Sequence, residues 1–423
     1  MRQLWRWGLI IGLLAAGCGP APTLAPPTPA RLTQAATLTA PAPNASATPA
    51  SRELVLWVPP EFAPVAEQPG GVVLAAQLDN YAQLHPGWRV RARAKAVTGA
   101  GGLLESLLNA YHAAPAALPD LVALSRGDLE AAAAADLVLP LDTWVSAAVF
   151  EAYYPFAQTL GRVNGQWVSL PFAIDARWLA YAPAAYPVPP ARWAEVVTGT
   201  LIFPGAEPFA LSLLADYLAG GALTGADGRL ALDAGRLAAI LTAWQELAAA
   251  GVLPLSTLAY DTPAATWQIF RERRASLALT SASWYLREAA RVAGTSAALP
   301  PTTTGAPFTL VEGWGWALVN KAGDLAPAAE LLTWLVEPKR QAAWTQAAFR
   351  LPAQPAALAA WDDTPFIPLA AETLTRAQAQ PDERVLEKVG PLLRRALDDV
   401  LNDRATPAVA AAAAAQALAN SQP

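Results

Sequence analysis

Residues 119–136, PDLVALSRGDLEAAAAAD, decide the fold, because they predict a buried strand that leads directly into a helix. Leu121–Leu124 are apolar without interruption, which is typical of a strand covered on both faces. Ser125 and Asp128 have the spacing of a capping box, so they predict the start of an alanine-rich helix that runs to Asp136. A strand followed at once by a helix is the repeating unit of α/β folds.

The same alternation extends in both directions from this unit. Further strands are expected at Leu54–Val58, Trp88–Ala94, Leu179–Tyr181, Leu201–Phe203, Ser276–Leu279 and Gly315–Val319. Helices are expected at Val73–Leu84, Leu103–Tyr111, Ala210–Leu218, Ala234–Ala250, Pro263–Arg273 and Ala326–Glu337, and again in the alanine-rich region after Arg350. We therefore expect an α/β fold with a mostly parallel sheet, in which ligands bind beyond the carboxyl ends of the strands.

Composition limits the functions that the chain can have. Its 423 residues, 54% hydrophobic and 15% charged, are enough for two packed cores. A net charge of −5 without a block of like charges gives no electrostatic footprint for nucleic acid. His85, His112 and Cys18 are too few for a Cys/His metal site or for most nucleophile–base pairs. We expect no metal, no cofactor and no nucleic-acid partner, and any catalysis would depend on carboxylates.

The N-terminus predicts export and lipid anchoring. Residues 1–17 combine Arg2 and Arg6 with a short apolar run and a small-residue end, as in a signal peptide, and the run is shorter than the ~20 residues of a spanning helix. Cys18 follows this end directly and resembles the cysteine of the bacterial lipobox, which is lipidated before the preceding peptide is removed and the new N-terminus is acylated. Residues 18–52 are mostly Ala, Pro, Thr and Ser, which predicts a tether. We expect an extracytoplasmic protein anchored to the membrane through lipid on Cys18.

Six blocks in the remaining sequence resemble, in order, the extracellular solute-binding proteins of bacterial ABC importers, family 1, the maltose-binding-protein-like group. They are residues 119–122 with 137–142 (PDLV, LVLPLD), 164–171 (NGQWVSLP), 190–193 (PARW), 207–209 (EPF), 270–284, and 312–316 (EGWGW) with 328–335, followed by Leu351-Pro352. The resemblance covers the chain from about residue 53 to its end.

The resemblance implies a periplasmic-binding-protein-like type II fold, in which hinge strands join two α/β lobes around a ligand cleft. Lobe 1 would comprise residues 53–172 and 311–350, and lobe 2 would comprise residues 173–310 and 351–423. The implied function is the lipid-anchored binding component of an ABC importer. It would capture a small solute, a sugar or oligosaccharide, by hinge closure and deliver it to the permease subunits. We expect a monomer without enzymatic activity.

Eleven residues are candidates for ligand binding, because they stand at strand ends or in the matching blocks: Trp57, Glu61, Ser125, Arg126, Asp128, Asp175, Glu207, Phe209, Trp284, Glu312 and Trp314. The resemblance places Asp175 at the first hinge crossing and Trp284 after a strand of the second lobe. Tryptophan rings suit the apolar faces of sugars, although we expect most of the sixteen tryptophans to be core. The polar residues of the first lobe are equally suited to helix caps or surface positions.

Two other functions remain compatible with the sequence. A secreted glycosidase would use a pair of carboxylates, for which Asp175, Glu207 and Glu312 are available. A sensory or scaffolding lipoprotein would use the same fold without transport. A phosphorylated solute would require a basic cleft, and only Arg126 is cationic among the candidates, so uncharged solutes are favoured.

Overall fold

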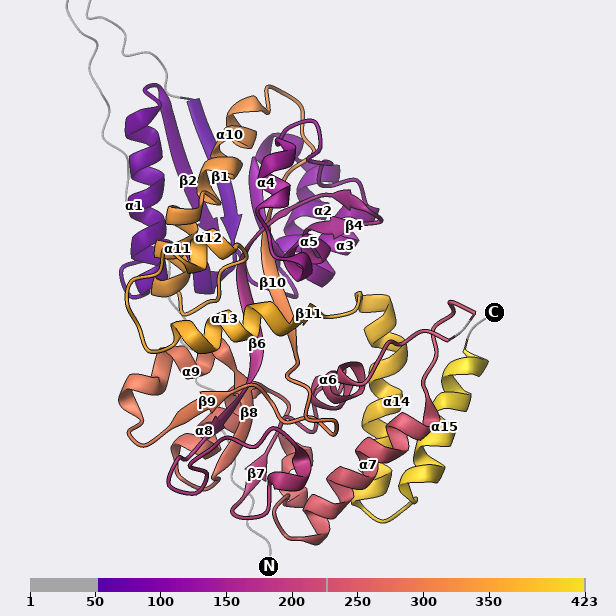
Figure 1. Cartoon of the computed structure of the whole chain (residues 1–423). Coiled ribbons are helices and arrows are strands. Elements are labelled where there is room, and N and C mark those ends of the chain that lie inside the picture. Colours follow the sequence, from indigo (N-terminus) through magenta and orange to yellow (C-terminus); the bar gives the residue numbers. More distant parts are fainter. Residues whose placement is uncertain (1–51, 226, 422–423) are drawn as a thin grey trace, which may run out of the picture. The chain divides into compact units, whose positions relative to one another are not determined.

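The computed structural model describes residues 52–225 and 227–421. The predicted signal peptide, Cys18 and the tether up to residue 51 lie outside the described residues. Two groups of strands and helices form two lobes, which β6 (Leu170–Tyr181) and β10 (Thr309–Leu318) connect (Figure 1).

The first lobe contains β1 (Arg52–Val58), α1 (Pro69–Leu84), β2 (Trp88–Ala94), α2 (Leu103–Ala113), β3 (Leu121–Ser125), α3 (Arg126–Ala134), α4 (Ala147–Glu151), α5 (Pro155–Gly161), β4 (Arg162–Val163), β5 (Gln166–Trp167), α10 (Ala326–Leu335), α11 (Pro338–Ala347) and α12 (Pro355–Leu358). The second lobe contains β7 (Leu201–Ile202), α6 (Leu211–Ala219), α7 (Ala234–Ala249), α8 (Pro263–Arg271), β8 (Leu277–Ser281), α9 (Ala282–Glu288), β9 (Ser296–Ala298), α13 (Ile367–Arg376), β11 (Ala377–Ala379), α14 (Glu383–Leu401) and α15 (Pro407–Asn420). The predicted alternation of strands and helices is thus confirmed.

The strands pair in the order β2-β1-β3-β10-β6-β8-β7, with β9 beside β6 and β11 beside β10. β1 is parallel to β2 and β3, and β7 is parallel to β8. The expectation of a mostly parallel sheet is wrong at its centre, where β10 is antiparallel to both β3 and β6, and β6 is antiparallel to β8. The reason is that the chain leaves the first lobe along β6 and returns to it along β10, in the opposite direction.

Each connecting strand belongs to both lobes. The first part of β6 pairs with β10, and its last five residues, Arg177 to Tyr181, pair with β8. β10 begins against β11 at Thr309 and ends against β3 at Leu318. A continuous hydrogen-bonded ladder therefore links the two cores at the level where the lobes meet.

The chain crosses a third time after Trp361. Residues 351–361, which the sequence assigns to lobe 2, contact α11 of the first lobe: the amide of Ala353 donates to Gln341 (3.0 Å), and the indole of Trp361 donates to Thr345 (3.0 Å). α13 then packs on the second half of β6, where the indole nitrogen of Trp178 donates to Thr373 Oγ1 over 2.9 Å.

Most tryptophans serve the two cores. In the first lobe, Trp316 stacks on Phe172 with ring centres 4.6 Å apart. In the second lobe, Trp244 is fully buried and meets Phe203 edge-on at 4.4 Å. Trp178 has no exposed surface and lies on β6 between the cores. These rings explain why the high tryptophan count is largely structural.

We expect Trp178→Ala to destabilise the protein by about 3–5 kcal/mol, because it removes a fully buried ring and leaves the hydroxyl of Thr373 without its donor. Urea unfolding followed by circular dichroism measures the loss. Trp144→Ala is the matched control, because Trp144 is 37% exposed and its removal leaves a smaller cavity. Equal losses in the two variants would contradict a special role for the ring between the lobes.

Candidate functional site

A cleft of about 590 Å³ lies between the lobes, within the range of small-molecule sites, about 300–1,000 Å³. Its first-lobe wall comes from the segment after β1, the start of α3 and the middle of β10. Its second-lobe wall comes from the segment before α6, the start of α9 and the start of α14. β6 and β10 form the floor through Asp175 and Glu312, which are register partners in the ladder.

Nine of the eleven candidates line this cleft: Glu61, Ser125, Arg126, Asp128, Asp175, Phe209, Trp284, Glu312 and Trp314. Trp57 lies outside it, in the core of the first lobe at 3% exposure, with the ammonium of Lys95 4.5 Å from its ring centre. Glu207 is also buried away from the lining and forms an ion pair with Arg177. Which of these residues bind a ligand stays a prediction.

Asp175 holds the floor of the cleft together. Its carboxylate accepts hydrogen bonds from the backbone and the hydroxyl of Ser283 at the start of α9. It also accepts from Arg350 Nη1 (2.7 Å), and Arg350 Nη2 donates to Glu61 of the first lobe over 2.5 Å. The side chains of Asp175 and Arg350 are only 8% and 11% exposed. Asp175 therefore joins β6, α9 and the segment after α11, and its oxygens are already engaged.

Glu312 is the floor carboxylate without a partner. Its side chain is exposed to the cleft, and among the described residues it makes no hydrogen bond or ion pair. Protein crowds its other sides, and this desolvation raises the pKa of Glu312 above its usual value, although Arg177 opposes the shift. Glu312 is thus free to receive a donor group from a ligand.

The start of α3 forms one wall of the cleft. Ser125 caps this helix, as the sequence predicts. The Ser125 hydroxyl accepts from the amide of Asp128 (3.4 Å) and donates to its carboxylate (3.1 Å). Burial raises the pKa of Asp128. Arg126 pairs with Glu130 and donates to three carbonyls at the end of α5, including that of Thr159 at 2.7 Å. This is a favourable place for a cation, since carbonyls are unpaired there.

α14 of the second lobe approaches this wall directly. The amide of Glu383 donates to Glu130 Oε2 over 3.1 Å, so the two lobes touch across the mouth of the cleft. A Cβ on Gly127 would lie 2.5 Å from the carboxylate of Glu383, which shows how closely that side chain covers the start of α3. Desolvation and the nearby charges of Glu387, Glu130 and Asp128 raise the pKa of Glu383.

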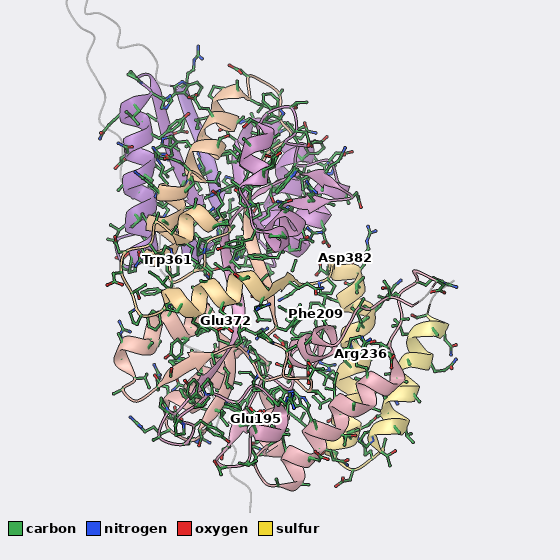
Figure 2. All side chains as sticks on the ribbon, in the orientation of Figure 1. Glu195, Phe209, Arg236, Trp361, Glu372 and Asp382 are labelled. Atoms are coloured by element: carbon green, nitrogen blue, oxygen red, sulfur yellow. The ribbon has the colours of Figure 1, made fainter. Side chains whose placement is uncertain are left out.

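Three aromatic side chains complete the lining. Trp314 of β10 is half-buried against Phe62, with ring centres 5.4 Å apart, and the ladder shifts register directly after it. Such a shift changes the direction of side chains along a strand. Trp284 follows the Ser281 cap of α9, and Phe209 precedes α6. Figure 2 shows Phe209 at the start of α6 and Asp382 at the start of α14. Both lobes therefore present aromatic surface to the same space.

Sequence reasoning missed Arg350, Ser283 and Glu383. Arg350 directly precedes the Leu351-Pro352 block, and Ser283 directly precedes Trp284, so the matching blocks were the signal that could have found them. Glu383 follows Pro381-Asp382, a helix-start pattern. What no pattern showed is that these residues meet Asp175 and Gly127 in space.

Two negative findings apply to the described residues, 52–225 and 227–421. In that part of the chain no group of three or more His, Cys, Asp or Glu side chains is arranged to hold a metal ion. None of its helices combines the length and the apolar character needed to cross a membrane.

Two α/β lobes around a cleft, joined by crossing strands, define a binding protein of the hinged type. The chain belongs to the bacterial extracellular solute-binding proteins, because the model of that family matches residues 76–368. No curated protein matches the chain.

Solved structures of low sequence identity have the same fold, that of type II periplasmic binding proteins. A maltose-bound MalE protein of T. maritima is 18% identical, with a TM-score of 0.67 over 87% of this chain and 99% of its own. The GacH receptor of Streptomyces glaucescens is 16% identical, with a TM-score of 0.66 over 88% of this chain and 100% of its own. The maltose/maltodextrin-binding domain of Bdellovibrio bacteriovorus is 20% identical, with a TM-score of 0.62 over 87% of this chain and 99% of its own. The predicted family and fold class are confirmed.

We expect Arg350→Gln to destabilise the protein by about 3–5 kcal/mol, because it leaves the buried Asp175 without its cation. Denaturant unfolding measures the change. Arg91→Gln is the control, because Arg91 forms a long, exposed pair with Glu53 and should cost less than about 1 kcal/mol. Additivity of Arg350→Gln with Asp175→Asn would contradict the coupling inferred here.

Proposed function

We propose that the protein is the lipid-anchored binding component of an ABC importer and captures a sugar or oligosaccharide between its lobes. The observation that carries the proposal is that Trp314 of the first lobe and Trp284 of the second line one cleft. Flat rings cover the apolar faces of sugars, while carboxylates and hydroxyls receive sugar hydroxyl groups. Membership of the family and the similar structures with bound maltose, acarbose and maltotriose support this solute class.

Closure of the two lobes is the change by which the permease would recognise that a solute is bound. A solute that contacts both Trp284 and Trp314 stabilises the conformation in which the lobes are close, so it shifts the population toward that form. The permease would then distinguish the loaded protein from the empty one by the relative position of its lobes. The ladder of β6 and β10 and the third crossing after Trp361 allow such a movement without breaking either core.

The carboxylates support binding rather than hydrolysis. A glycosidase needs two carboxyl groups that are both free to act on the scissile bond. Glu207 pairs with Arg177 away from the cleft lining, and Asp175 accepts hydrogen bonds from Ser283 and Arg350. Only Glu312 of the three is without a partner among the described residues. Asp175, Glu207 and Glu312 therefore do not supply the pair of free carboxyl groups that a glycosidase requires.

A thermal-shift screen of mono- and oligosaccharides tests the function, since a solute at 100 times its Kd stabilises a protein by ~2.7 kcal/mol. We expect Trp284→Ala and Trp314→Ala each to weaken binding of the solute so identified by about tenfold, measured by calorimetry. Trp144→Ala, which removes a partly exposed ring outside the cleft lining, should leave the affinity unchanged. Turnover of the solute, or a loss of affinity in the control alone, would contradict the proposal.

The proposed anchor has its own test at Cys18, the chain's only cysteine. In cells, the full chain should fractionate with membranes, and mass spectrometry should find acyl chains on an N-terminal Cys18. Cys18→Ala should abolish the acyl modification and leave residues 1–17 attached, and mass spectrometry detects both changes. A membrane-bound protein that carries an unmodified Cys18 would contradict lipid anchoring, whereas solute binding is independent of this result.

A further inference from the structure

The cleft carries negative charge that the protein does not balance. Its lining includes five acidic side chains and two arginines. Both arginines are already paired, Arg126 with Glu130 and Arg350 with Asp175 and Glu61. The lining acids without a cationic partner among the described residues are Asp128, Glu312 and Glu383. An unpaired carboxylate in a confined site attracts a cation strongly, because solvent screens it poorly.

These three groups come from three directions. Asp128 belongs to α3 of the first lobe, Glu383 to α14 of the second, and Glu312 to β10 in the floor. Desolvation raises the pKa of each, and this cost exceeds the opposing effect of Arg177 and Arg350 on Glu312 and of the Ser125 hydroxyl on Asp128. A neutral ligand would leave this cost in place, whereas a positive ligand would remove it.

The aromatic walls are compatible with a cationic ring compound. Trp284 and Trp314 offer flat faces that bind both the C–H groups of a sugar and a nearby positive charge. Arg287 already lies over Trp284, 5.2 Å from the ring centre, so this indole accepts a cation. A linear alkyl amine would interact with the carboxylates, but it has no flat face to cover the rings of Trp284 and Trp314.

We infer that the solute is an amino sugar whose protonated amino group binds at Glu312, with Asp128 and Glu383 adding to the attraction. This inference rests on the proposed function and narrows its solute class from sugars in general to sugars with a positive charge. The amino group donates hydrogen bonds to the Glu312 carboxylate, and such charge-assisted bonds are stronger than neutral ones.

The sign of the pH dependence follows from the groups around Glu312. Asp175 and Arg177 face it from β6, Glu207 from the segment before α6, and Arg350 from the segment after α11. As pH falls through the raised pKa of Glu312, the carboxyl group becomes neutral and the attraction for an ammonium group is lost. The affinity for an amino sugar should therefore decrease as the pH is lowered, whereas the affinity for a neutral sugar should not.

Calorimetry on the full chain with matched sugars tests the inference. The probes are glucosamine, galactosamine and the β-1,4-linked glucosamine disaccharide, against glucose, galactose and cellobiose, which share ring and linkage but lack the charge. N-acetylated forms keep the nitrogen and remove its charge. We expect at least one amino sugar to bind about tenfold or more tightly than both matched neutral forms.

Glu312→Gln should abolish this discrimination, because it should lower the affinity for the amino sugar at least about tenfold more than the affinity for the matched neutral sugar. Glu105→Gln removes the same charge from an exposed position on α2 and should change neither. Asp128→Asn should also lower the affinity for the amino sugar, but by less than Glu312→Gln does. Equal or tighter binding of the neutral sugars would overturn the inference and leave the proposed function standing. Failure of both sets to bind would overturn the carbohydrate assignment together with the inference.

Discussion

The antiparallel ladder between β6 and β10 is the constraint on which the cleft depends. Because each of these strands contributes to both lobes, the floor of the site is a hydrogen-bonded sheet rather than a pair of loose linkers. Asp175 and Glu312 face each other on this ladder, and their positions follow from strand register. The floor residues belong to this ladder, whereas the walls come from segments that belong to one lobe or the other.

The charges of the floor divide into two functions. Asp175, Arg350 and Glu61 satisfy one another, so their main effect is to fasten β6 to segments far away in the chain. Glu312 is left without such a partner among the described residues, and its position is costly for the folded state. Groups that are costly for stability and idle in the empty protein are often retained for binding. Neighbouring carboxylates on one ladder can therefore have opposite roles, and their partners decide which.

The sequence predicted the alternating elements well, because buried apolar runs and caps such as Ser125 are local signals. It did not predict that β6 starts at Leu170, since Asp175 and Arg177 interrupt the apolar pattern. Their partners, Ser283, Arg350 and Glu207, are distant in sequence, so no window contains the interaction. The site was reached largely through the matching blocks. Trp57 was misjudged as a cleft candidate for a similar reason: a strand-end ring can face either side, and here its side is core.

The placement of binding groups relative to the connecting strands has a consequence for how such a protein can change over evolution. Glu312 and Trp314 stand on β10, so under the proposed function a substitution there would change both the solute preference and the strand that connects the lobes. Phe209 and Trp284 stand outside both connecting strands, on segments that only the second lobe contains. Under the same proposal, substitutions at these two positions would change the solute preference without altering either connecting strand. New solute preferences should therefore arise first on the second-lobe wall, with the floor following only when the lobes can tolerate it.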